Sequence, residues 1–165
     1  FNLWPQLSRT ILVLLMFCGA MAGSTGGGIK TTTFVVLAAT VISVIRGHED
    51  TIILKRRIDK SVVYRALAIV TVAMLVVVFS TSVILLSSED QIGAIDALFE
   101  SVSAFGTVGL TTGITQILSP ISKICLCLTM FIGRVGPVSL GLAIAGKKNS
   151  RKVAAVRPEG KVIVG

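Results

Sequence analysis

Apolar residues along this chain gather in long unbroken runs rather than alternating with polar residues. The clearest run is Val63–Ser87, which contains the valine-rich stretch Val70–Val83. About 20 apolar residues in a helix are enough to cross the hydrocarbon core of a bilayer, so this run is long enough to span a membrane. Runs of this length predict helices rather than strands. The fold class that we expect is therefore an all-α membrane protein.

A second apolar run, Thr10–Ile45, is interrupted by a glycine-rich stretch. One continuous helix over this run would be about 54 Å long, much longer than a hydrocarbon core of about 30 Å. A kinked helix would need only one or two glycines, whereas four glycines with two hydroxyl residues favour a gating loop at membrane depth. Lys30, nearer the expected cytoplasm, can equally reach the interface by snorkelling. The candidate loop residues are Gly23, Ser24, Thr25, Gly26, Gly27, Gly28 and Lys30.

The third feature is a short amphipathic segment, Ile92–Phe105, with Asp96 and Glu100 on one helical face. It is too short to cross a bilayer, and a Gly/Thr-rich stretch (106–113) and an apolar run (118–146) follow it. This order is typical of a re-entrant pore loop, whose irregular backbone must be buried in protein or line water. Glycines allow successive carbonyls to point the same way and to replace the hydration shell of a monovalent cation. The expected filter residues are Thr107, Val108, Gly109 and Leu110.

The charged residues predict the orientation in the membrane. The formal net charge is +8 and 53% of the residues are hydrophobic, above the about 45–50% of soluble domains. Basic residues concentrate in 46–62 and 147–165, where the cytoplasmic-loop bias places them, so no nucleic-acid partner is expected. Residues 88–117 contain four acids and no Lys or Arg. We therefore expect the filter to face outward, with an acidic mouth that concentrates cations.

An internal repeat connects the two ends of the chain. A shift of 114 residues places Arg9 on Lys123, Met16-Phe17 on Met130-Phe131 and Gly19 on Gly133. The interrupted first span and the last span are then equivalent parts of a span–pore loop–span unit. Residues 63–146 form one complete unit. Because one unit cannot enclose a pore axis, we expect a missing N-terminal part to supply others.

Two other functions have little support in these residues. A phosphate-binding loop requires G-x-x-x-x-G-K-[ST] after a strand, but Ile29 separates Gly28 from Lys30 and the preceding segment is an apolar span. The single histidine, His48, lies in an expected cytoplasmic loop and has no second histidine for a zinc-protease motif. We therefore expect no catalytic residues, no bound cofactor and no enzyme activity.

Arg134 is the most unusual charge in the sequence, because it lies near the middle of the last apolar run. A charge at the bilayer centre costs at least about 2.5–3.5 kcal/mol on insertion scales. Snorkelling to an interface is the alternative, but roughly a dozen residues separate Arg134 from either end of the run. We therefore expect Arg134 to face a water-filled path, as a barrier in the pore.

Together these motifs resemble the Trk/Ktr/HKT potassium transporters, in particular the membrane subunit of bacterial Ktr systems. The resemblance covers essentially the whole chain. The segments that carry it are Ala22–Thr31, Ser103–Thr111, Met130–Pro137 and Arg157–Gly165.

The resemblance implies four covalently linked repeats around one potassium pore in a multi-pass bacterial cell membrane protein. Residues 1–62 would be the second half of repeat three, and 63–146 would be repeat four (span 63–87, pore helix 92–105, filter 106–113, span 118–146). Residues 147–165 would be a basic cytoplasmic C-terminus. Gly109 would be the filter glycine, with K+ bound only at the filter residues. Gly23–Lys30 would be the gating loop, and Arg134 would line the path below the filter.

The resemblance also implies partners: a homodimer, and a cytosolic ring of regulatory subunits that bind the nucleotide. Because two repeats and the third filter are absent, this chain alone is not expected to conduct. Channel-like and ion-coupled transport are both compatible with these residues. The alternative function is another multi-span cation carrier or a non-conducting membrane scaffold. A filter segment recurring four times in the full gene is required only by the potassium pore.

Overall fold

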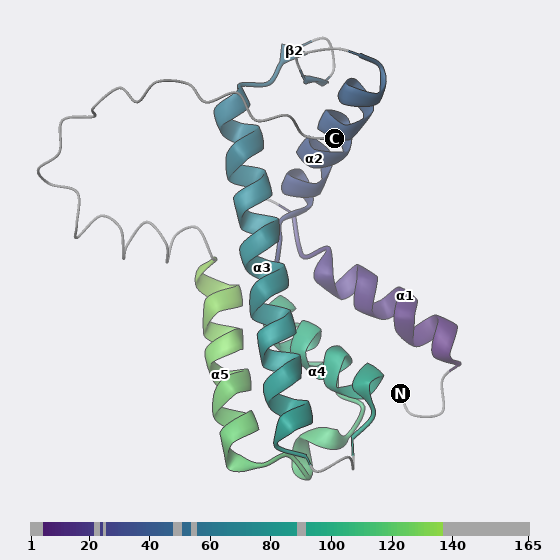
Figure 1. Ribbon diagram of the computed structural model, residues 1–165, viewed down its shortest axis with the longest axis vertical. Coiled ribbons are helices and arrows are strands. Elements are labelled where there is room, and N and C mark those ends of the chain that lie inside the picture. The colour runs from purple at the N-terminus through teal and green to yellow at the C-terminus, as the bar shows by residue number, and fades with distance from the viewer. Residues whose placement is uncertain are drawn as a thin grey trace, which may run out of the picture.

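The fold is helical, as the apolar runs predict. In the computed structural model the long helix α3 (Lys60–Leu86) lies at the centre (Figure 1). α2 (Thr31–Ile45) lies along the first half of α3, and α4 (Ala94–Gly106) and α5 (Pro120–Val135) pack on its second half. α1 (Gln6–Phe17) packs against α4. The residues that the structure describes are 5–21, 24, 26–47, 51–53, 56–88 and 92–136.

One small sheet departs from the all-α prediction. β1 (Ile52–Ile53) pairs antiparallel with β2 (Arg56–Arg57), in the segment between α2 and α3. The Ile58 amide extends the pairing by donating to the Thr51 carbonyl over 2.9 Å. Two residues per strand make this a local hairpin, so the chain remains an all-α protein apart from this connection.

α3 is the helix, among the described residues, that is long and apolar enough to cross a membrane. It begins where the Asp59 side chain accepts a hydrogen bond from the Ser61 amide (3.1 Å), and its 27 residues correspond to about 40 Å. Only 22% of its most apolar 18-residue window is buried. The buried positions follow one helical stripe of small and β-branched residues: Ala66, Ala73, Val77, Ser80 and Ile84. The rest of its apolar surface faces outward, which suits a lipid environment.

The predicted interruption of the first apolar run is confirmed, and it is longer than a kink. α1 ends at Phe17, α2 begins at Thr31, and the described residues between them are not helical. The helix stops earlier than the Gly23–Gly28 stretch, and Gly19, two residues after its end, packs against backbone. A Cβ on Gly19 would lie 2.6 Å from the Gly27 carbonyl oxygen and 2.9 Å from that of Ile29. α1 also extends further towards the N-terminus than expected and includes Arg9.

α4 occupies the middle of the packed region and matches the predicted short helix to within two residues at each end. It has 13 residues, about 20 Å, and α1, α3 and α5 surround it. Phe99 and Phe105 are fully buried on α4, and Phe105 lies 6.3 Å, ring centre to ring centre, from Phe17 of α1. The main core cluster comprises Met16, Ile29, Ala73, Val77, Phe99, Val102 and Phe105.

α5 begins with Pro120, a residue that suits the first helical position, and the Ser119 side chain caps it by accepting from the Ser122 amide (3.2 Å). α1 and α5 start at positions related by the same shift of 114 residues, Gln6 and Pro120. α5 ends at Val135, where Gly136 has a φ of 87°. The remainder of the expected span, 137–146, and the basic segment 147–165 lie outside the described residues.

Candidate ion filter and the loop beneath it

The filter segment, residues 106–113, leaves the end of α4 with an alternating backbone. Thr107 (φ 52°) and Gly109 (φ 82°) are left-handed, whereas Val108 between them is not. Alternating the hand of successive residues turns successive peptide planes over, so their carbonyls can face one side. A Cβ on Gly109 would meet no atom within 4 Å. Glycine is therefore required at 109 by its backbone conformation and not by a lack of space.

Hydrogen bonds from α4 hold this segment close to the helix. The Val108 amide donates to the Ser103 carbonyl (3.0 Å), and the Ser103 hydroxyl donates to the Leu110 carbonyl (2.6 Å). The Leu110 carbonyl is therefore directed to the helix. Among the described residues, the carbonyls of Thr107, Val108 and Gly109 accept no such bond from α4.

Beyond Leu110, the chain folds around Glu100 of α4. The Glu100 carboxylate is buried (6% exposed) and accepts hydrogen bonds from the Thr111 hydroxyl, the Thr112 amide (3.2 Å) and the Thr115 hydroxyl (3.2 Å). Gly113, with a φ of 95°, makes the turn that brings Thr115 back to the carboxylate. A cavity of about 360 Å³ borders this segment, lined among others by Glu100, Gly109, Leu126 and Met130.

The loop 18–30 reaches the filter segment directly. The Gly27 amide donates to the Thr107 hydroxyl (2.9 Å), and the Gly28 amide donates to the Gly133 carbonyl of α5 (3.2 Å). The structure thus brings two predicted sites, separated by 80 residues in sequence, into contact. The loop contacts the helix end of the filter segment, the end opposite Glu100.

Close backbone packing explains why this junction is rich in glycine. A Cβ on Gly133 would lie 1.9 Å from the Phe105 carbonyl oxygen, and one on Gly27 would lie 2.7 Å from the Thr107 hydroxyl. A Cβ on Gly106 would lie 2.9 Å from the Met16 carbonyl oxygen. Three segments therefore approach each other at backbone distance at the end of α4, and side chains would separate them.

The remaining candidate loop residues contribute less to this contact. The Ser24 hydroxyl accepts from the Gly26 amide (3.2 Å), within the loop itself. Lys30 is exposed and precedes the first residue of α2. Gly23 and Thr25 lie outside the described residues.

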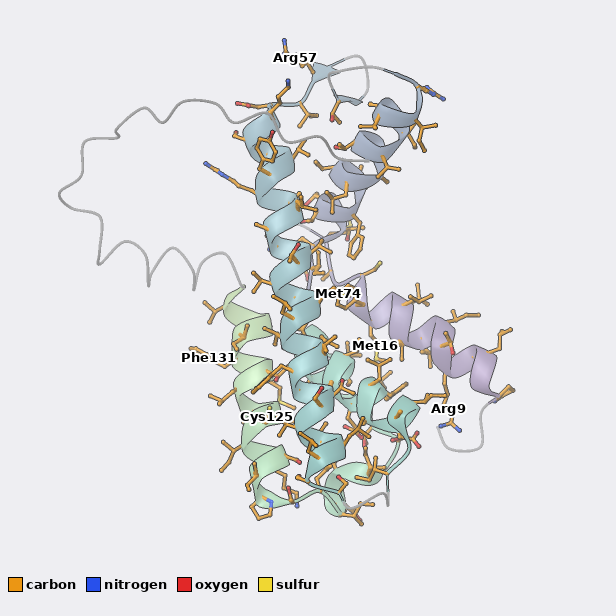
Figure 2. The ribbon with its side chains drawn as sticks, in the orientation of Figure 1. Arg9, Met16, Arg57, Met74, Cys125 and Phe131 are labelled. Carbon is orange, nitrogen blue, oxygen red and sulfur yellow. The ribbon has the colours of Figure 1, made fainter. Side chains whose placement is uncertain are left out.

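Arg134 is exposed in the last turn of α5, next to Gly133. Because the Gly133 carbonyl binds the loop, Arg134 lies one residue from the contact between the loop and α5. Phe131, one turn earlier, projects from α5 away from α3 (Figure 2).

The ion pair between Arg9 and Asp96 is not predicted by the sequence pattern. Arg9 extends from α1 towards the first turn of α4 (Figure 2), and its Nη1 lies 2.8 Å from Asp96 Oδ1. The two side chains are 16% and 27% exposed. The repeat is the one feature of the sequence that points to Arg9, because it places a basic residue at the same point of both equivalent spans. Nothing near Asp96 in the sequence indicates its partner, which is 87 residues away.

The expectation of an open acidic mouth needs correction for the two acids that the structure describes. Asp96 is paired with Arg9, and Glu100 is buried and bound by three donors. Both carboxylates therefore bind groups around α4. Glu89 and Asp90 lie outside the described residues.

The chain is similar in sequence to known cation transport proteins. The model of the family described as "TrkH: Cation transport protein" matches residues 1–154. The chain is 40% identical to the Ktr system potassium uptake protein B of Bacillus subtilis, over 93% of the chain and 33% of that protein. It is 36% identical to the protein of the same name from Vibrio alginolyticus, over 86% of the chain and 31% of that protein.

A third relative is the potassium/sodium uptake protein NtpJ of Enterococcus hirae, 34% identical over 97% of the chain and 37% of that protein. The chain therefore spans about a third of the length of these curated relatives.

Proposed function

Because the chain belongs to the TrkH family of cation transport proteins, we propose that it is part of a membrane subunit that takes up K+ through a carbonyl-lined filter. The family is one of transporters and not of enzymes, and it implies a membrane location. Potassium is the ion in the names of the Ktr-system relatives. We infer that this chain carries the same ion, because the backbone carbonyls of its filter segment can bind a cation.

The observation that carries the proposal is the backbone of the filter segment. A short buried helix ends at Gly106 and is followed by left-handed residues at 107 and 109. Rings of carbonyls held in this way can replace the hydration shell of K+. The C-terminal end of α4 carries the negative end of the helix dipole, which adds a favourable field for a cation. We propose that Thr107, Val108 and Gly109 supply the ion-facing carbonyls and that Leu110 anchors the end of the filter.

We propose that the glycine-rich loop Gly23–Lys30 is the gate, held by its described residues Gly27 and Gly28. It lies against the helix end of the filter, and two amide hydrogen bonds, Gly27 to Thr107 and Gly28 to Gly133, hold it there. Breaking these bonds would release the loop without unfolding a helix. Arg134, next to Gly133, would then be the barrier below the filter: a positive charge opposes K+ by about 4 kcal/mol at 4 Å for an effective dielectric near 20.

The rest of the pore would come from N-terminal repeats of a longer protein. Met16 and Met130, which the shift of 114 residues relates, support this. Met16 of α1 is 5% exposed because α4 covers it, whereas Met130 of α5 is 45% exposed and lines the cavity. A further repeat would cover Met130 as α4 covers Met16. A homodimer and a cytosolic nucleotide-binding ring complete the proposed assembly, with no cofactor in this chain.

The second candidate is another multi-span cation carrier or a non-conducting scaffold. The Enterococcus relative is named for sodium as well as potassium, and this supports a carrier with a different cation preference. The full gene distinguishes the candidates, because only the filter proposal requires four segments like Ser103–Thr111.

The direct test is Gly109→Ser in the full-length protein. A side chain at φ 82° costs about 1–2 kcal/mol, so relaxation of the filter should reduce the K+ preference over Na+ roughly tenfold. Relative uptake of the two ions into vesicles measures this preference. The control is Gly47→Ser, which places the same strain at φ 73° with open space around it, outside the filter. Equal preference in wild type and Gly109→Ser, at equal protein level, would exclude Gly109 from the filter.

A further inference from the structure

We propose that Glu100 is a positioning residue that ties the outer end of the filter segment to α4 and thereby maintains ion selectivity. This proposal rests on the proposed function, and it assigns the role to a side chain that does not contact the ion. Three observations support it: the burial of Glu100, the convergence of three donors on one of its oxygens, and the adjacent anchor at Ser103.

Glu100 is buried on a helix whose neighbouring positions, Phe99 and Ser101, are fully buried. A buried carboxylate is strongly unfavourable unless hydrogen bonds compensate for the lost water. The donors that Glu100 has among the described residues all come from residues 111–115, the outer end of the filter segment and the turn that follows it. These bonds therefore hold the segment in place, and they also replace the water that the buried Glu100 carboxylate has lost.

The three donors reach the same carboxylate oxygen, Oε1. They come from Thr111, Thr112 and Thr115. The Thr111 hydroxyl lies 2.9 Å from the Thr115 hydroxyl and also accepts from the Gly113 amide (2.9 Å). This segment is therefore closed around the carboxylate in one compact hydrogen-bonded turn. Bonds to a charged acceptor are stronger than bonds between neutral groups.

Ser103 lies three residues after Glu100, so the two side chains are neighbours on one face of α4. Ser103 holds the Leu110 carbonyl, and Glu100 holds residues 111–115. Together they fix the chain immediately after the ion-facing carbonyls of 107–109. Loss of the Glu100 anchor would allow these carbonyls to shift outward, and selectivity between K+ and Na+ depends on their placement and number.

The test uses the full-length protein in vesicles, with uptake of K+ and Na+ normalised to protein amount. Glu100→Ala removes the acceptor, and we expect a roughly tenfold loss of K+ preference, the size of one lost charge-assisted hydrogen bond. Glu100→Gln retains an acceptor oxygen and should remain closer to wild type than Glu100→Ala. The matched control is Asp96→Asn, an acid one turn earlier on α4 that binds Arg9 and not the filter segment; its K+ preference should equal that of wild type.

A folded Glu100→Ala protein with wild-type K+ preference would overturn the proposal. Equal losses in Glu100→Ala and Glu100→Gln would also overturn it, because an acceptor oxygen at position 100 would then not protect the K+ preference. If Glu100→Ala does not fold, Thr115→Val removes one donor on an exposed residue; unchanged preference in Thr115→Val and Thr111→Val would then contradict the tether. A wild-type protein that takes up no K+ would instead contradict the proposed function.

Discussion

Gly133 shows how a single residue determines the packing at the end of α4. It allows α5 to approach the end of α4 so closely that a Cβ would lie 1.9 Å from the Phe105 carbonyl oxygen. Its own carbonyl accepts the Gly28 amide of the loop. One glycine thus sets the spacing of two elements and supplies the acceptor that holds a third.

We expect Gly133→Ala to destabilise the protein by at least about 1–3 kcal/mol, the usual cost of forcing atoms into a packed core. The backbone atoms of Phe105 cannot move aside without displacing α4. Thermal unfolding of the full-length protein in detergent measures the change as a lower melting temperature.

Gly93→Ala is the control for Gly133→Ala. A Cβ on Gly93 would lie 3.3 Å from only the Asp96 carboxylate, the end of a flexible side chain. Melting temperatures that fall equally in both variants would show that backbone packing at Gly133 has no special role.

At the scale of elements, α4 is held by its neighbours at both ends. Its first turn binds Arg9 of α1 through Asp96. Its last turn packs against Gly133 of α5 and carries the filter segment, which contacts the loop. The acid in the first turn also interacts favourably with the positive end of the helix dipole. α1 therefore runs along α4: Arg9 contacts the first turn of α4, and Met16 lies against its last turn, where the loop also makes contact.

A double-mutant cycle tests the contact between α1 and α4. Arg9→Gln, Asp96→Asn and the double variant should give a coupling energy of about 0.5–2 kcal/mol in the free energy of unfolding, because the pair is only partly exposed. The matched control is Lys123→Gln on α5, the repeat equivalent of Arg9. The Lys123 amine contacts a backbone carbonyl, that of Gln116, at 3.3 Å. A coupling energy near zero would show that α1 is held by apolar packing alone.

At the scale of the whole molecule, the basic hairpin and the turn before α5 lie at opposite ends of α3. The hairpin of β1 and β2 precedes the start of α3, and the turn before α5 lies beside its end (Figure 1). A helix of about 40 Å keeps these ends on different sides of a hydrocarbon core of about 30 Å. By the positive-inside rule, we expect the hairpin in the cytoplasm and the filter outside.

Cysteine labelling in intact cells tests this orientation, in a background without native cysteines. Gln116→Cys should react with an impermeant external thiol reagent, because its side chain is exposed near the end of the filter segment. Arg57→Cys, also exposed, should react only after the cells are permeabilised. Labelling of Arg57→Cys before permeabilisation would reverse the orientation.

The sequence by itself determined the features that depend on neighbouring residues. Run length and composition predicted α3, the interrupted first span and the short α4, because helix length and glycine content are local properties. The left-handed Gly109 also follows from local chemistry, since glycine adopts that conformation at little cost.

Only the tertiary structure decided which distant groups meet. The contacts of Arg9 with Asp96 and of Gly27 with Thr107 join residues 87 and 80 positions apart, and no periodic pattern encodes such pairs. Asp96 and Glu100 were expected at an acidic mouth, but in the structure they bind groups around α4. The Leu110 carbonyl, expected to face an ion, accepts a hydrogen bond from Ser103. The physical reason is that a buried polar group must find a partner, and the partners available are known only once the helices have packed.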